Sequence, residues 1–132
     1  MTTVLVVEDN PLNKQIFQRI LTRRGGLVAK HTEDVAEVMQ LAEAGEVDII
    51  LMDIALCNST YQGRPVDGIK ITQMLKANPK TAKVPVILVT ANAVEGDREN
   101  LLKQSRADGF IPKPVTDHQA FLDEIRAMLQ KE

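Results

Sequence analysis

Acidic side chains follow two strongly apolar runs in this sequence. Glu8 and Asp9 come directly after the run 4–7, and Asp53 follows the run 47–52. Three acids packed together would repel one another and resist ionisation. A hard divalent cation with oxygen ligands resolves that repulsion, and Mg²⁺ bound by one or two carboxylates and waters is the usual solution. The residue types therefore predict a metal site, if the fold brings the two segments together.

A hydroxyl and an ammonium group occur at the ends of two later runs. Thr90 ends the apolar run 84–89, and Lys113 ends the short run 110–113. A metal, a hydroxyl and an ammonium group together suit the charge of a phosphoryl group during in-line transfer. A carboxylate is itself a nucleophile that can form an acyl phosphate. The set predicts phosphoryl transfer to Asp53.

Short apolar runs alternate with longer helical patterns along the chain, which predicts a parallel sheet covered on both faces. The expected fold is α/β, a doubly wound, flavodoxin-like (βα)5 three-layer sandwich with sheet order 2-1-3-4-5 in one domain, 1–132. In such a sheet, ligands bind beyond the carboxyl ends of the strands. Strands are expected at 4–7, 27–31, 47–52, 84–89 and 110–113, and helices at 11–24, 35–42, 69–78, 94–105 and 117–129.

Local signals predict several boundaries. Thr32 is the expected N-cap of the second helix, and Asp117 or Thr116 that of the last. Gly25-Gly26 is expected to end the first helix. Residues 55–65 are expected to form a polar loop.

Composition excludes several classes of function. The net charge is -2 and the pI is about 5.7, whereas a nucleic-acid-binding domain usually shows a basic face. The N-terminus does not resemble a signal peptide, and the longest apolar runs are too short to span a bilayer. The single Cys57 fits a reducing cytosol. We expect a cytoplasmic protein without nucleic-acid or membrane partners.

The chain resembles the receiver domain of two-component response regulators over essentially its whole length. Each matching motif alone is weak, but all of them occur in the right order and at the expected strand ends. The motifs are VLVVEDN at 4–10, LMDI at 51–54, DG at 67–68, VILVTA at 86–91 and KP at 113–114.

The resemblance implies a role for each acid. Asp53 would accept a phosphoryl group from a phosphohistidine on a histidine kinase or a histidine phosphotransfer protein. Asp9 would bind Mg²⁺ (or Mn²⁺) directly and Glu8 through water, and the main-chain carbonyl of Ala55 would complete the metal shell.

The resemblance also implies a set of phosphate contacts and a switch. Thr90, Ala91 and Lys113 would contact the phosphoryl group, and the Lys113-Pro114 peptide bond would be cis. Phe110 occupies the position of the aromatic switch residue, whose ring turns inward when the threonine moves toward the phosphate.

Simpler explanations exist for each residue taken alone. Glu8 and Asp9 would suit a loop that caps the first helix, Thr90 a surface hydroxyl and Lys113 a solvated charge. Phe110 is expected to pack inward in the resting state. The isolated histidines, at 31 and 118, are expected at the surface.

The segment after Asp53 departs from the family pattern. Cys57 replaces an expected proline, and residues 58–65 resemble the extended loop of cyanobacterial-type receivers, an insertion of about half a dozen residues that a surface loop can absorb. Either this is a tolerated loop, or Tyr61 and Arg64 select the kinase or shield the acyl phosphate. Ala55 and Asn92, at the positions that hold an attacking water in the family, predict slow self-dephosphorylation.

Several functions compete at this point. The first is a stand-alone, chemotaxis-regulator-like receiver. It would bind a downstream protein or a second copy through helix 94–105, strand 110–113 and the last helix, around Phe110, Asn100 and Lys103. A variant is a receiver excised from a hybrid histidine kinase. A Mg²⁺-dependent phosphohydrolase would need a second Asp where Ala55 stands, so no enzyme activity is expected. The intact acid, Thr90 and Lys113 set argues against a pseudo-receiver.

Overall fold

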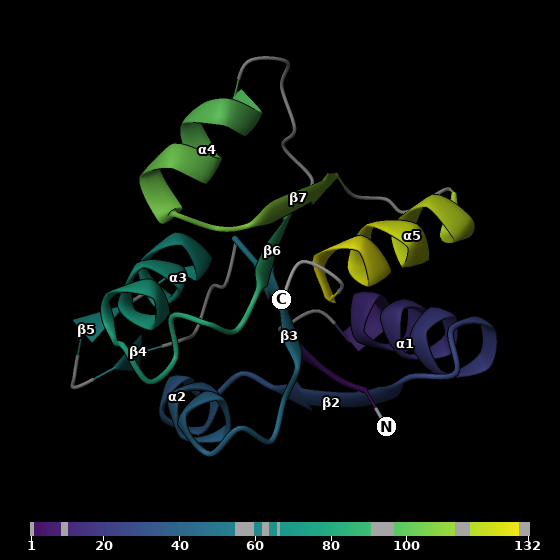
Figure 1. Ribbon diagram of the computed structural model, residues 1–132, viewed down its shortest axis with the longest axis horizontal. Helices are drawn as coiled ribbons and strands as arrows, with labels where there is room; N and C mark the ends of the chain where they lie inside the picture. Colours follow the sequence, from purple (N-terminus) through teal and green to yellow (C-terminus); the bar gives the residue numbers. More distant parts are fainter. Residues whose placement is uncertain are drawn as a thin grey trace.

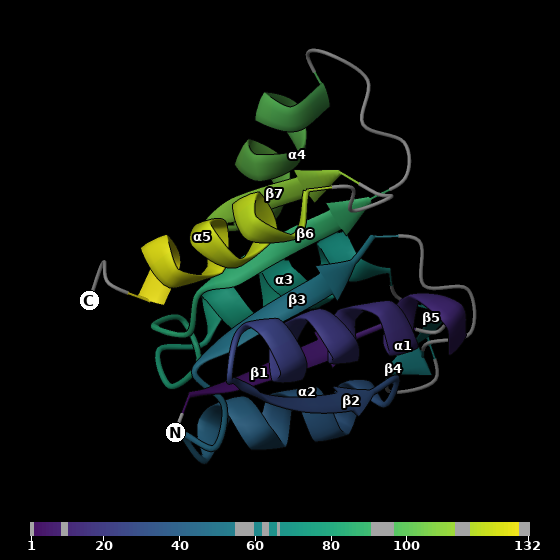
Figure 2. The same ribbon diagram turned by 90° about the vertical axis from the view of Figure 1, so that its right-hand side faces the viewer.

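A single parallel sheet forms the centre of the protein. The computed structural model describes residues 2–8, 11–54, 60–61, 64–65, 67–90, 97–112 and 117–129. Within these ranges five parallel strands pair in the order β2-β1-β3-β6-β7, which is the predicted order 2-1-3-4-5 (Figures 1 and 2). The strands are β1 (Thr3–Val7), β2 (Val28–Thr32), β3 (Ile49–Asp53), β6 (Val86–Thr90) and β7 (Gly109–Pro112).

Helices cover both faces of the sheet, which confirms the predicted three layers. Helices α1 and α5 lie on one face, and α2, α3 and α4 lie on the other (Figure 1). Their bounds are α1 (Pro11–Arg19) with its π-helical continuation η1 (Ile20–Arg24), α2 (Val35–Glu43), α3 (Gly68–Ala77), α4 (Asp97–Ser105) and α5 (His118–Leu129).

The strands are apolar on both faces because each face packs against helices. Alternate residues of β3 enter different clusters: Ile49 and Leu51 pack with α1 and α5, whereas Ile50 and Met52 pack with α2 and α3. This alternation places the next residue, Asp53, on the face of α1 and α5.

The segment expected as a polar loop contains a small hairpin. Strands β4 (Thr60–Tyr61) and β5 (Arg64–Pro65) pair antiparallel, on the side of the sheet that carries α2 and α3 (Figure 1). Two-residue strands are too short to show a hydrophobic period, so the sequence gives no signal for them.

The caps of two helices differ in how well they were predicted. Thr32 is not the N-cap of α2. Asp34 takes that role and accepts a hydrogen bond from the Ala36 N–H (3.0 Å), while Thr32 Oγ1 accepts one from the Asp34 N–H (3.0 Å). The predicted Asp117 does cap α5, because its carboxylate accepts from the Ala120 N–H at 2.9 Å.

The ends of the first helix agree with the prediction, and α2, α3 and α5 lie within one residue of their expected ranges. The helix expected at 94–105 is described from Asp97 to Ser105, and residues 94–96 lie outside the described residues. Gly25 follows η1, and Gly26 has a positive φ of 64°. No helix in the described part of the chain is long and apolar enough to cross a membrane.

Candidate functional site

Two buried carboxylates lie at the carboxyl ends of neighbouring strands. Val7 of β1 and Met52 of β3 are register partners. Glu8 and Asp53 are the next residues on the two chains, so their main chains lie next to each other. The exposed fraction is 1% for Glu8 and 4% for Asp53, and both residues have interaction partners. Burying a carboxylate is costly unless other groups compensate its charge. A pair of them at one sheet edge indicates a built site for positive charge.

The main chain around Asp53 is held from two sides. Asp53 pairs with Val89 in the β3–β6 ladder, and the Ile54 N–H donates to the Val89 carbonyl (3.2 Å). From the other side, the Gly68 N–H donates to the Ile54 carbonyl (3.2 Å). Asp53 is therefore the end of a fixed strand and is not carried on a loop.

Thr90 is the last residue of β6, as predicted, and pairs with Pro112 at the end of β7. Since Asp53 pairs with Val89, the main chain of Thr90 lies one residue beyond Asp53 on the neighbouring strand. Phe110 is 6% exposed and belongs to the cluster beneath α2 and α3. Its ring packs inward in this structure, as expected.

Several predicted site residues lie outside the described residues, namely Asp9, Ala55, Ala91, Lys113 and Pro114, as do Asn92 and Cys57. For Tyr61 and Arg64 the structure describes the main chain of the β4–β5 hairpin. Among the residues described, no group of three His, Cys, Asp or Glu side chains could hold a metal. The described residues include two acids of the predicted metal set, Glu8 and Asp53.

His31 does not fit the expectation of a surface residue. It is half-buried on the edge strand β2, and its Nε2 atom is buried without a hydrogen-bond partner among the described residues. Burial lowers the pKa of the His31 imidazole below its usual value, although a hydrogen bond with the main chain of Lys14 opposes this effect. The sequence does not predict the burial of His31, because β2 is only partly covered by helices and its residues show no clear alternation of buried and exposed positions.

One residue near Asp53 was noted in the sequence only as part of a motif. Gly68, of the Asp67-Gly68 pair, begins α3 and is buried against the main chain of Asp53 and Ile54. A glycine after an acid indicates a turn or a close approach, but its partner cannot be found without the fold.

The arrangement defines a class of protein. The sequence model of the response regulator receiver domain matches residues 4–131. The chain belongs to this family, whose members are signalling switches of two-component systems. They interact with histidine kinases or phosphotransfer proteins and with downstream targets.

Individual relatives agree with this. The polar-differentiation response regulator DivK of Brucella anthropi is 35% identical over 127 residues, which are 96% of this chain and 95% of the relative. The receiver domain of a sensor histidine kinase from Pseudomonas aeruginosa is 33% identical, with a TM-score of 0.71 and coverage of 98% and 95%. That crystal structure has a magnesium ion coordinated in its active-site cleft. A receiver from Methanospirillum hungatei, at 20% identity and a TM-score of 0.78 over 99% and 95% of the chains, shares the fold.

Proposed function

We propose that Asp53 is the phosphoacceptor of this receiver and that its modification changes which proteins the chain binds. The donor is a phosphohistidine on a histidine kinase or a histidine phosphotransfer protein. The observation that carries this proposal is the burial of Asp53, 4% exposed, at the carboxyl end of the central strand β3, beside the buried Glu8.

In the proposed reaction, a carboxylate oxygen of Asp53 forms a bond to phosphorus. The bond from phosphorus to the imidazole nitrogen of the donor breaks, and the leaving nitrogen keeps the electron pair. Such a transfer depends on positioning and on charge stabilisation more than on covalent chemistry by the protein. The two-sided hold on the main chain at Asp53 supplies the positioning.

The donor set at this edge fits Mg²⁺, or Mn²⁺, which prefer carboxylate oxygens. Glu8 and Asp53 are buried acids on adjacent strand ends, and in this proposal Asp9 and the Ala55 carbonyl complete the set. The metal would neutralise charge on the phosphoryl oxygens. The magnesium in the related Pseudomonas aeruginosa receiver supports this assignment.

The remaining roles follow the family. Thr90, Ala91 and Lys113 contact the phosphoryl group, and Phe110 responds to it. Thr90, at the end of β6, pairs with Pro112, at the end of β7. This pairing supports the proposed link between Thr90 and Phe110, because β7 also carries Phe110. The output is the face of α4, β7 and α5, which binds a downstream protein or a second copy.

The proposal covers 1–132 as one receiver domain in the cytoplasm without hydrolase activity of its own. The match of the family model over 4–131 supports one receiver domain, and the single cysteine supports a cytoplasmic location. Ala55 supports the absence of hydrolase activity, since a hydrolase would place an acid there. A free-standing regulator and the receiver of a sensor kinase are both among the relatives, and both use the same acceptor chemistry.

Incubation with acetyl phosphate and Mg²⁺ tests the acceptor. We expect intact-mass measurement to show one added phosphoryl group on the wild type and none on Asp53→Asn. Asp48→Asn is the matched control, because Asp48 is an exposed acid directly before the start of the strand that ends at Asp53. Equal labelling of the wild type and Asp53→Asn would exclude Asp53 as the acceptor.

A further inference from the structure

The start of α3 lies directly against the strand end that carries Asp53. Gly68 is the first residue of α3 and is buried. Its amide donates to the Ile54 carbonyl (3.2 Å), and its own carbonyl accepts a hydrogen bond from Thr72 Oγ1 (2.7 Å). Gly68 is thus fixed both to the acceptor strand and to its own helix.

The contact leaves no room for a side chain. A Cβ on residue 68 would overlap the carbonyl oxygen of Asp53 and would lie 2.8 Å from the Asp53 carbonyl carbon and 2.9 Å from the Ile54 Cα. All three are main-chain atoms, which cannot rotate away as the end of a side chain could. Any residue other than glycine must therefore move α3 or the main chain of Asp53.

Both partners of this contact are held in place. Helix α3 is anchored in the core by Ile71 and Leu75, which are fully buried, and Asp67 caps its first turn by accepting from the Lys70 N–H (2.8 Å). Asp53 is paired with Val89 and is the last residue of its strand. Because α3 cannot simply move away, strain at residue 68 would be shared by both partners and would displace the Asp53 main chain.

We propose that Gly68 is a positioning residue that sets the location of the Asp53 main chain, and with it the acceptor carboxylate. This inference rests on the proposed function of Asp53. A displacement of about 1 Å can cost about a hundredfold in rate when a reaction depends on alignment. Gly68→Ala should therefore impair phosphoryl transfer while the protein remains folded.

The test compares Gly68→Ala with two controls in the acetyl phosphate assay. Asp67→Ala removes the neighbouring cap, which weakens the start of α3, without adding an atom near Asp53. Gly45→Ala places a Cβ in open space at a positive φ of 71°, before the start of β3. Thermal unfolding confirms that each variant is folded at the assay temperature, and calorimetry measures its affinity for Mg²⁺.

We expect Gly68→Ala to be phosphorylated at least about tenfold more slowly at saturating Mg²⁺ and to bind Mg²⁺ more weakly, with both controls like the wild type. A wild-type rate in Gly68→Ala, or an equal loss in Asp67→Ala, would overturn the inference. A wild type that takes up no phosphoryl group on Asp53 would instead overturn the proposed function.

Should Gly68→Ala not fold, the wild type itself decides. Addition of beryllofluoride and Mg²⁺ should shift the NMR amide resonance of Gly68 and leave that of Gly45 in place. An unchanged Gly68 resonance would overturn the inference.

Discussion

His31 is a half-buried histidine. It pairs with Val6 on the edge strand β2, and a salt bridge between Lys14 and Glu33 (2.7 Å) lies between α1 and the end of this strand. Burial and the positive charge of Lys14 both lower the pKa of His31. The folded protein therefore favours the neutral imidazole.

The pKa of His31 predicts a loss of stability at mildly acidic pH. An unfolded histidine titrates near about pH 6.5, so below this pH the unfolded chain binds a proton that the folded chain resists. The free energy of unfolding then decreases as the pH falls from about 6.5 toward the lower folded pKa, at less than about 1.4 kcal/mol per pH unit because the side chain is partly exposed.

Urea unfolding at pH 7.5 and pH 5.5 measures this effect (both about one unit from the reference value). We expect His31→Gln to lose less stability between the two conditions than the wild type. His118→Gln removes the other histidine and is the matched control. The same change in both variants would contradict the assignment to His31.

At this scale the sequence predicted residues whose type and position carry the signal. Glu8 and Asp53 are acids directly after apolar runs, and the structure places both at the sheet edge. Gly68 and His31 could not be predicted in the same way. Their properties depend on which main-chain or helix atoms pack against them, and those atoms are distant in sequence or on another element.

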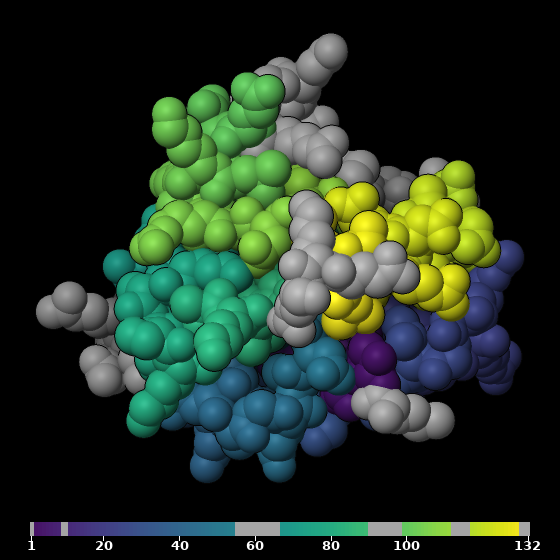
Figure 3. Space-filling model, in the orientation of Figure 1, coloured from purple at the N-terminus to yellow at the C-terminus, as the bar shows by residue number. Residues whose placement is uncertain are grey.

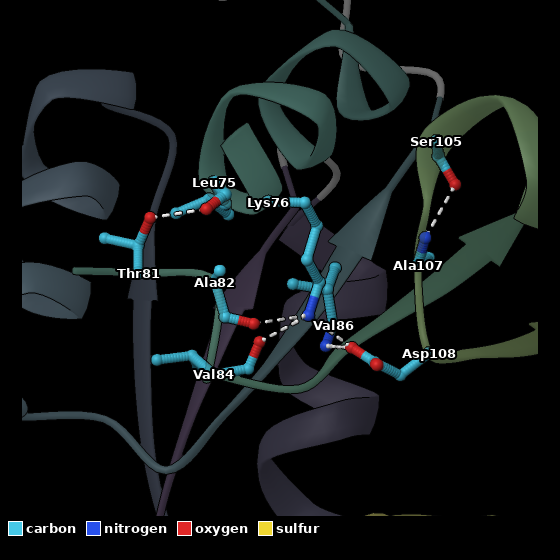
Figure 4. A network of polar contacts seen from close by, with 9 residues as sticks. All are labelled: Leu75, Lys76, Thr81, Ala82, Val84, Val86, Ser105, Ala107 and Asp108. Carbon is cyan, nitrogen blue, oxygen red and sulfur yellow. Dashed lines mark hydrogen bonds and ion pairs between the residues drawn. The ribbon is translucent and has the colours of Figure 1, made fainter. Parts of the chain in front are cut away.

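Among the elements, α3, the start of β6 and the segment before β7 are joined by a polar network (Figure 4). Lys76 Nζ donates to the carbonyls of Ala82 (3.2 Å) and Val84 (3.0 Å) and to Asp108 Oδ2 (2.6 Å). The same oxygen of Asp108 accepts from the Val86 N–H (2.9 Å). The Lys76 side chain is only 9% exposed, so its charge depends on these partners.

Asp108→Ala should destabilise the fold without changing the chemistry at Asp53. It leaves the Val86 N–H and the buried Lys76 ammonium without their carboxylate, which typically costs about 1–3 kcal/mol. Asp108→Asn keeps an acceptor oxygen and should cost less. Urea unfolding compares the two variants. Equal losses, or a slower reaction with acetyl phosphate in a folded Asp108→Ala protein, would disagree with this account.

A second contact joins α3 to α4. Gln73 Nε2 donates to the Gln104 carbonyl (2.8 Å), and the space-filling view shows the two helices meeting along a continuous surface (Figure 3). Helix α4 is therefore held against α3, the helix that begins at Gly68. As a result, α3 contacts both α4, which belongs to the proposed output face, and the strand that ends at Asp53.

The elements with a strong hydrophobic period were predicted well. All strands of the main sheet appear within one or two residues of the expected ranges. The hairpin β4–β5 and the π-helical η1 were missed, because neither a two-residue strand nor a change in helical pitch alters the pattern of apolar residues. The cap at Asp34 was missed because Thr32, two residues earlier, has an equally suitable side chain.

On the scale of the whole molecule, the sheet separates two apolar clusters. The buried acids Glu8 and Asp53 lie at the carboxyl ends of two central strands of this sheet. A cation bound there should stabilise the entire fold, because the unfolded chain does not bring the two acids together. At 100 times its Kd, a ligand specific for the folded state adds about 2.7 kcal/mol to the free energy of unfolding.

Thermal unfolding with increasing Mg²⁺ checks this. We expect the midpoint temperature of the wild type to rise with Mg²⁺ concentration and that of Asp53→Asn to rise much less. Na⁺ at matched ionic strength controls for general screening. An equal response of both proteins to Mg²⁺ would place the cation elsewhere.

The Gly68–Ile54 bridge has a consequence for how receivers can diversify. The chain leaves β3 at Asp53 and enters α3 at Gly68, and the hydrogen bond from the Gly68 N–H to the Ile54 carbonyl holds these two points together. When the ends of a loop are held close together, lengthening the loop costs little conformational entropy. The stretch between them is thus a natural graft point, at which recognition peptides of different length could be exchanged to redirect a receiver to another kinase while its reaction centre is retained.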